Sequence, residues 1–226
     1  KGIEICLPNG EEVGLSGSSG LDPTQFAACI NQSRPESMIL VPQLLLATVT
    51  LTELGMMNPE HLKMVAVGGG KVADNLIDKA SSLKIPVYQG YGLSEAGSVV
   101  TLNLPDKQRK GSVGKALSHA DIRVSEKGEL EVAGALMEGY LGEQRTGDWL
   151  QTGDLGSIDE DGFVYVTGRI KNTFITSYGR NVHPEWVEAE FSQFPAVGQC
   201  LFYGEARDEN LLLVWPRFPI DAATLK

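Results

Sequence analysis

Asp154 and Arg169 are the residues of this sequence whose types and settings suggest chemistry most directly. Asp154 follows Gln151-Thr-Gly153, and Arg169 follows Gly168 at the end of an expected strand. A carboxylate can accept hydrogen bonds from two neighbouring hydroxyl groups, and a guanidinium can donate to ring or hydroxyl oxygens. The pair therefore predicts a clamp for a ribose, and we expect the turn that carries Asp154 to be exposed. A salt bridge across a hairpin on the surface is the simpler alternative.

The segment Gln89-Gly-Tyr-Gly-Leu-Ser-Glu95 offers a second set of groups. The phenol of Tyr91 can stack on a purine, and the hydroxyl of Ser94 can donate to a phosphate oxygen. Glu95 can bind Mg²⁺, which prefers hard oxygen ligands and keeps several waters. Taken alone, a tyrosine in a glycine-rich loop more often serves packing.

Three consecutive glycines, Gly68, Gly69 and Gly70, follow an apolar run and precede an expected helix. They are either a tight strand-to-helix turn or a surface without side chains on which a flat adenine can lie. Neither a GxGxxG pattern nor P-loop spacing follows, so they do not predict a phosphate cradle.

The segments Tyr91 to Glu95, Gln151 to Asp154, Gly168 to Lys171 and Gly179 to Glu185 together resemble the motifs of the adenylate-forming superfamily of acyl-CoA synthetases, luciferases and peptide-synthetase adenylation domains. The resemblance runs from about residue 14 to about residue 202. It departs from the family pattern at Ser94, where threonine is usual and the hydroxyl is kept.

The resemblance implies roles for particular residues. Ser94 and Glu95 would be catalytic, with Glu95 as the Mg²⁺ ligand, and Lys171 would be the hinge of a mobile C-terminal lid. The residues implied to bind ATP or AMP are Gly68, Gly69, Gly70, Gly90, Tyr91, Gly92, Ser94, Asp154 and Arg169.

The implied reaction joins a carboxylic acid to ATP as an acyl-adenylate and then passes the acyl group to the thiol of CoA. We expect a long-chain fatty acid, because Gly90 leaves room for a chain and the Leu44 to Leu46 stretch could line a tunnel, although core packing explains those leucines equally well. An aromatic acid and an acyl-carrier-protein acceptor are the alternatives. A non-catalytic fragment that only binds adenylate is a further possibility.

Two lysine-bearing motifs of the family have no counterpart in this sequence. The loop from Leu15 to Pro23 is rich in serine and glycine, but Asp22-Pro23 stands where the phosphate loop has Pro-Lys. We interpret it as a turn before a helix that Asp22 caps. A segment like the lysine motif near the end of the C-terminal domain is also absent, so we expect a fragment of a longer enzyme that is inactive by itself.

Composition narrows the class of protein. The formal charge of −10 argues against a nucleic-acid surface. Three widely spaced cysteines indicate a reducing, cytoplasmic location without metal or disulfide sites. The apolar stretch from residue 39 to 57 is interrupted by polar residues and predicts a buried helix and no membrane span, while peripheral membrane association stays open.

These residues must be positioned by an α/β fold with three parts. Residues 1–105 predict a mixed or parallel sheet with helices, 106–168 a small antiparallel β subdomain, and 169–226 a partial α+β lid. The expected strands are 3–7, 38–41, 63–67, 85–89, 121–124, 128–132, 162–166, 172–176 and 211–215, and the expected helices cover 23–33, about a dozen residues from 42, 72–83 and 184–194. We also predict a hairpin turn over 159–162 and helix capping by His183.

Overall fold

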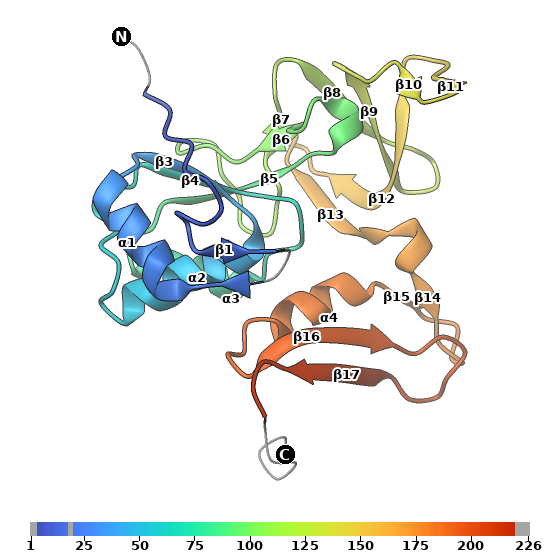
Figure 1. Ribbon diagram of the computed structural model, residues 1–226. Coiled ribbons are helices and arrows are strands. Elements are labelled where there is room, and N and C mark those ends of the chain that lie inside the picture. The colour runs from blue at the N-terminus through green and yellow to red at the C-terminus, as the bar shows by residue number, and fades with distance from the viewer. Residues whose placement is uncertain (1–3, 18–19, 220–226) are drawn as a thin grey trace. The chain divides into compact units, whose positions relative to one another are not determined.

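The computed structural model describes residues 4–17 and 20–219 (Figure 1). The chain forms two compact units, one from residues 1–70 and 74–88 and the other from residues 71–73 and 89–226. The expected boundaries after residues 105 and 168 are not among the limits of these two units, and the division into three subdomains stays a prediction. The α/β class with a mixed sheet and small antiparallel sheets is confirmed.

The first unit is built from parallel strands and three helices. β3 (Ser37–Leu40) pairs in parallel with β4 (Met64–Val67), and β5 (Val87–Tyr91) follows in the sheet order. The helices are α1 (Pro23–Ser33), α2 (Pro42–Glu53) and α3 (Asp74–Ser82). Apolar residues at helical and strand spacing supply the core, so Phe26, Leu45 and Val65 are almost completely buried.

The start of the chain differs in part from expectation. Residues 4–7 form no strand, so the strand predicted over 3–7 is wrong for its described part, and Ile3 lies outside the described residues. The serine-rich loop contains β1 (Leu15–Ser16) and β2 (Gly20–Leu21). Asp22 caps α1 as predicted, since its Oδ1 accepts from the backbone N–H groups of Thr24 at 2.9 Å and Gln25 at 3.1 Å.

In the second unit the chain turns to antiparallel strands. The end of β5 pairs with β6 (Thr101–Leu102), and β6 pairs with β7 (Lys115–Ala116). A four-stranded antiparallel sheet has the order β13-β12-β9-β8, with bounds β8 (Ala120–Val124), β9 (Glu129–Gly134), β12 (Leu150–Ile158) and β13 (Val164–Arg169). Between β9 and β12 lies a small hairpin of β10 (Gly139–Tyr140) and β11 (Glu143–Gln144).

The turn that joins β12 to β13 is the predicted hairpin. Asp159 Oδ1 accepts from the backbone N–H groups of Asp161 and Phe163, and Gly162 takes a left-handed φ of 83°. Arg109 pairs with both Asp159 and Asp161. A single arginine thus bridges two of the acids of this turn.

The last part of the chain begins with η2 (Ile170–Asn172), a 3₁₀ turn that shortens the expected strand to β14 (Phe174–Ile175), which pairs with β15 (Asn181–Val182). The helix α4 (Pro184–Phe191) ends earlier than predicted and packs against β16 (Val197–Tyr203), which pairs with β17 (Leu211–Pro216). His183 stands at the N-cap position of α4, but its side chain makes no capping hydrogen bond. Its Nδ1 lies instead 2.9 Å from Thr173 Oγ1, so the predicted capping by this side chain is wrong.

None of the helices formed by residues 4–17 and 20–219 has both the length and the apolar character that crossing a bilayer requires.

Candidate functional site

Asp154 is the centre of a polar network in the second unit. It lies in β12 opposite Arg169 of β13, and its Oδ1 accepts from Arg169 Nε at 2.8 Å. Its Oδ2 accepts from the Tyr91 hydroxyl at 2.7 Å. Asp154 is only 3% exposed, whereas the Arg169 side chain is 49% exposed. The expectation that Asp154 lies in an exposed turn is wrong, because a strand and two donors enclose it.

A local irregularity of β12 places this carboxylate. The register of β12 with β9 shifts between Gln151 and Leu155, and Gly153 takes a left-handed φ of 73°. Thr152 Oγ1 donates to the Leu130 carbonyl at 2.7 Å, and Gly153 N donates to Glu129 Oε1 at 2.9 Å. Bulges of this kind turn a side chain away from the regular alternation of a strand.

Tyr91 connects the network to the core. Its ring packs beside two clusters of buried apolar residues, which contain Val100, Val132, Leu130 and Val164. Burial raises the pKa of the Tyr91 phenol, and the hydrogen bond to Asp154 raises it further. The tyrosine therefore stays protonated and donates to Asp154 at neutral pH. The ring of Tyr91 thus packs in the core while its hydroxyl binds Asp154.

The two glycines on either side of Tyr91 are required by packing. A Cβ on Gly92 would lie 1.6 Å from the Ser98 carbonyl oxygen. A Cβ on Gly90 would lie 2.9 Å from both Leu102 Cδ1 and the Thr101 carbonyl oxygen. Contacts this short with backbone atoms exclude a side chain. Their roles in nucleotide or acyl binding stay predictions.

Glu95 lies on η1 (Ser94–Ala96), a single 3₁₀ turn that is held by the buried side chain of Ala96. The Tyr140 hydroxyl of β10 donates to Glu95 Oε1 at 2.5 Å. This hydrogen bond lowers the pKa of the Glu95 carboxyl, so Glu95 is charged at neutral pH. Ser94 is exposed on the same turn.

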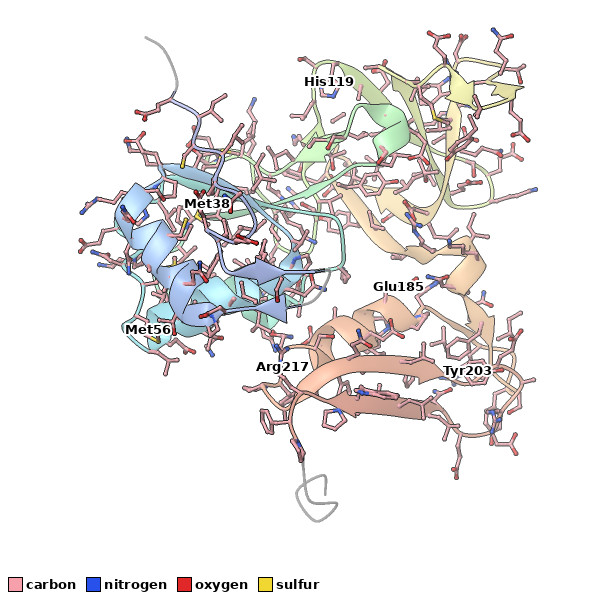
Figure 2. The ribbon with its side chains drawn as sticks, viewed as in Figure 1. Met38, Met56, His119, Glu185, Tyr203 and Arg217 are labelled. Carbon is pink, nitrogen blue, oxygen red and sulfur yellow. The ribbon has the colours of Figure 1, made fainter. Side chains whose placement is uncertain are left out.

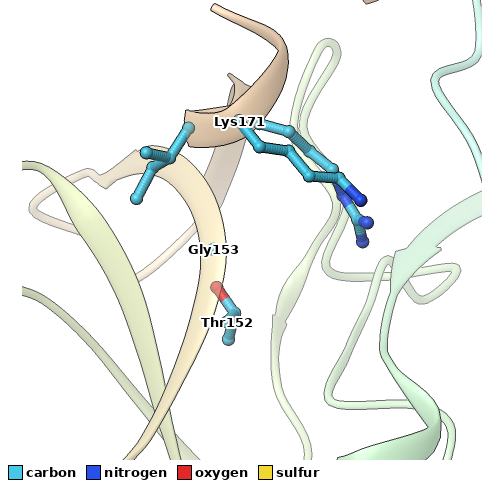
Figure 3. Close-up of a pocket in the computed structure, with 5 residues that line it drawn as sticks. Thr152, Gly153 and Lys171 are labelled. Carbon is cyan, nitrogen blue, oxygen red and sulfur yellow. The ribbon is translucent and has the colours of Figure 1, made fainter.

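A cavity of about 310 Å³ opens beside this network, and Figure 3 shows the residues that line it. It is lined by Thr152, Gly153, Arg169, Ile170 and Lys171. Its volume lies at the lower end of the range of small-molecule sites. The cavity thus lies between the Thr152–Gly153 segment of β12 and the segment from Arg169 to Lys171.

Hydrogen bonds join the segment around Lys171 to the beginning of α4. Thr173 Oγ1 donates to the Arg169 carbonyl at 2.9 Å, and Asn172 Nδ2 donates at 2.7 Å to Oε1 of Glu185, which lies in the first turn of that helix (Figure 2). A Cβ on Gly168 would lie 2.7 Å from Nδ1 of the His183 ring. Lys171 itself is exposed. Its function as a hinge stays a prediction.

Gly68, Gly69 and Gly70 follow β4 in the first unit. Gly69 takes a left-handed φ of 78°, which glycine adopts without strain. A Cβ on Gly70 would meet nothing closer than Pro42 Cγ at 3.4 Å. Packing therefore does not require glycine at Gly70, and the role of these residues in adenine binding stays a prediction.

The donors for a metal ion are few. Within the described ranges 4–17 and 20–219, no three His, Cys, Asp or Glu side chains gather into a cluster that could hold an ion. Mg²⁺ is commonly bound by one or two carboxylates together with phosphates and waters. A single carboxylate such as Glu95 fits that mode of binding.

Comparison with known proteins decides the family. The model of the family described as AMP-binding enzyme matches residues 2–141, more than half of the chain. This chain belongs to the AMP-binding enzyme family. Among its relatives, a long-chain-fatty-acid–CoA ligase (FadD15) of Mycobacterium bovis is 35% identical over 130 residues, which are 54% of this chain and 22% of that protein.

Other similar proteins are named as ligases of an aromatic acid, succinylbenzoate. A 2-succinylbenzoate–CoA ligase of Lactococcus lactis is 30% identical over 187 residues, covering 79% of this chain and 40% of that protein. The o-succinylbenzoate CoA synthetase of Bacillus subtilis, solved with its acyl-adenylate intermediate, superposes with a TM-score of 0.73 at 26% identity. That superposition covers 90% of this chain and 46% of the synthetase. The chain therefore spans less than half the length of these relatives.

Sequence reasoning missed one residue that contacts the predicted site, Tyr140. It stands in Glu138-Gly-Tyr140, far from Glu95 along the chain, and no charge or repeated spacing marks it. Only the fold of the β10–β11 hairpin brings its hydroxyl to Glu95.

Proposed function

We propose that this chain is part of an ATP-dependent ligase that adenylates a carboxylic acid and passes the acyl group to the thiol of CoA, releasing AMP and pyrophosphate. The observation that carries the proposal is the network of Tyr91, Asp154 and Arg169 beside a cavity, with Glu95 on the turn that follows Tyr91. These residues provide an aromatic ring, hydrogen-bond donors and carboxylates, which can contact the base, the ribose and a phosphate-bound metal ion. The chain belongs to a family that is described by AMP binding.

In this proposal Asp154 accepts from the ribose hydroxyls. Each carboxylate oxygen has a second lone pair besides the one that Tyr91 or Arg169 uses. Arg169 contributes its remaining guanidinium N–H groups from a half-exposed position. Tyr91 would hold the carboxylate and present its ring to the adenine.

Glu95 and Ser94 serve the phosphates. A Mg²⁺ ion bound by Glu95 would neutralise charge that develops on the leaving pyrophosphate. Ser94 would donate to a phosphate oxygen. The lid would turn about Lys171 between the two half-reactions, and the exposed position of that residue is compatible with such a movement.

The proposed substrate is a long-chain fatty acid, in line with the 35% identity to a fatty-acid–CoA ligase. An aromatic acid is the second candidate, because the 2-succinylbenzoate–CoA ligase matches over a larger part of this chain. A carrier-protein thiol in place of CoA and a fragment that binds adenylate without catalysis are the remaining alternatives. A cytoplasmic location belongs to the same proposal, supported by three free cysteines.

Calorimetry with this chain tests the proposal. The titrants are AMP, a non-hydrolysable long-chain acyl-adenylate analogue and an aromatic acyl-adenylate analogue. We expect all three to bind and the long-chain analogue to bind most tightly, since its chain buries apolar surface. Tighter binding of the aromatic analogue would show that the substrate is an aromatic acid and not a long-chain fatty acid. Failure of all three to bind would refute the nucleotide pocket in this chain.

Replacing Glu95 by Gln should weaken the Mg²⁺ dependence of ATP binding. The change removes the charge that attracts the cation while its amide oxygen can still accept from Tyr140. We expect the Mg²⁺ concentration for half-maximal ATP binding to rise at least about tenfold, as loss of one charge-assisted contact predicts. AMP binding without metal is the internal control and should not change. If the Mg²⁺ concentration for half-maximal ATP binding did not change, Glu95 would not be a ligand of the metal ion.

The adenine surface can be tested at Gly70. A methyl group there meets ordinary van der Waals contact with Pro42, so Gly70→Ala should leave the stability unchanged. If adenine lies on this backbone, the same methyl group should lower AMP affinity about tenfold or more by holding the base away. Equal AMP affinities of the variant and the wild type would show that Gly70 is only a turn residue.

A further inference from the structure

Tyr140 contacts the proposed metal ligand but has no part in the proposed reaction. Its hydroxyl donates to Glu95 Oε1 at 2.5 Å, and no other side chain in the described part of the chain donates a hydrogen bond to that carboxylate. The backbone N–H of Glu95 itself also donates to this carboxylate, and Oε2 accepts from no side chain in the described part of the chain. The aromatic ring contributes little to packing, since Tyr140 is 62% exposed.

The hairpin that carries Tyr140 is anchored on Glu95 itself. At the base of the hairpin, Met137 N donates to the Glu95 backbone carbonyl at 2.9 Å. The Tyr140 hydroxyl then reaches the side chain of the same residue. A backbone contact and a side-chain contact to one residue define both where the turn lies and which way its carboxylate points.

Contacts within the β10–β11 hairpin hold Tyr140 in this position. Gly139 takes a φ of 146°, and a Cβ there would lie 2.1 Å from the Glu143 carbonyl oxygen, so only glycine allows β10 and β11 to approach. Arg145 closes the base, donating from its backbone N to the Glu138 carbonyl at 3.0 Å and from Nε to the Met137 carbonyl at 3.1 Å. Leu141 at the tip is fully exposed.

We propose that Tyr140 is a positioning residue for the metal carboxylate: its hydroxyl orients Glu95 through Oε1 and leaves Oε2 for the cation that accompanies the nucleotide phosphates. This inference rests on the proposed function of Glu95. Groups that orient a metal ligand from outside the coordination shell commonly change metal affinity when they are removed, because a free ligand must be ordered on binding.

The first test is Tyr140→Phe, which deletes one oxygen from an exposed side chain and leaves the hairpin backbone intact. The probe is Mn²⁺ with ATP, and free Mn²⁺ is followed by electron paramagnetic resonance in the presence of the 226-residue chain. We expect the dissociation constant of Mn²⁺ in the ATP complex to rise roughly three- to tenfold, which is at or below the lower limit of such effects because the site is exposed. Affinity for AMP without metal should stay equal to that of the wild type.

A double-mutant cycle with Glu95→Gln separates positioning from a general structural effect. If Tyr140 acts through the charged carboxylate, Tyr140→Phe should change Mn²⁺ affinity no further in the Glu95→Gln background. Tyr178→Phe removes a hydroxyl from another exposed tyrosine and is the matched control. Side-chain NMR couplings of Glu95 provide a readout without metal, and they should change from one χ1 rotamer to an average in Tyr140→Phe.

Three results would overturn the inference. They are unchanged Mn²⁺ affinity in Tyr140→Phe, an equal loss in the Glu95→Gln background, or a parallel loss of metal-free AMP binding, which would indicate a distorted site. If wild-type chain binds AMP but shows no metal dependence with ATP, the metal assignment of Glu95 fails and this inference fails with it. If AMP also fails to bind, the proposed nucleotide pocket itself is wrong.

Discussion

Replacing Asp154 by Ala should abolish AMP binding and also destabilise the second unit. The change removes the acceptor of both the Tyr91 hydroxyl and Arg169 Nε, and the tyrosine is left with a buried donor. An unsatisfied buried group costs about 1–3 kcal/mol, and we expect the free energy of unfolding to fall by that amount. Loss of two charge-assisted hydrogen bonds to a ribose should weaken AMP binding at least about 100-fold.

The measurement combines calorimetry with urea denaturation followed by tryptophan fluorescence. Trp149, Trp186 and Trp215 are the three tryptophans of the chain, and all lie in the second unit, so their emission reports on the unit that holds Asp154. An intermediate AMP affinity is expected for Asp154→Asn, which keeps an acceptor for Tyr91 but loses the charge.

A matched control lies at the turn of the same hairpin. Asp159 also pairs with an arginine, Arg109, but it is not part of the predicted nucleotide site. Asp159→Ala should leave AMP affinity unchanged. If Asp154→Ala and Asp159→Ala bind AMP as the wild type does, the ribose assignment is wrong and the Asp154–Arg169 pair is structural only.

Replacing Gly92 by Ala should have the largest effect on stability. A Cβ at this position would overlap the Ser98 carbonyl oxygen at 1.6 Å and approach Val99 Cα at 2.8 Å. Backbone atoms cannot rotate away as the end of a side chain can, so the turn that carries Ser94 and Glu95 must shift. We expect a loss of at least about 3 kcal/mol in the free energy of unfolding, at the upper end of overpacking effects.

Gly70→Ala is the control for the substitution itself, because its new methyl group has room. Far-ultraviolet circular dichroism in urea, which reports on both units, should show an early transition for Gly92→Ala only. A Gly92→Ala protein as stable as the wild type would mean that the segment from Gly92 to Ser98 can rearrange without penalty. Nucleotide binding by that stable variant would then show that Gly92 is not needed for the site either.

The family, the α/β class and most elements could be predicted from local patterns. Asp22 followed by Pro23 determines where α1 begins, and the alternation of apolar residues in β8, β9 and β13 marks antiparallel strands. Tyr91 was placed in one predicted site with Asp154 and Arg169 because the segments around these residues resemble the motifs of one family. Caps, strands and motifs are readable because each depends on neighbours within a few residues.

Where the prediction failed, the cause was a contact between distant segments. A glycine beside Asp154 favoured an exposed turn, but Tyr91 and Arg169 enclose the carboxylate from two other strands. His183 has the position of a cap, yet Thr173 provides a better partner.

Residue types and their local spacing were sufficient to identify the groups available for nucleotide chemistry and the order of the elements that carry them. The burial of Asp154 and the hydrogen bond from Tyr140 to Glu95 became evident only in the folded chain. Burial and hydrogen-bond partners arise from segments that fold together, and the identity of a residue does not contain that information. For this reason the residue types of the site could be predicted, whereas its hydrogen-bond network could not.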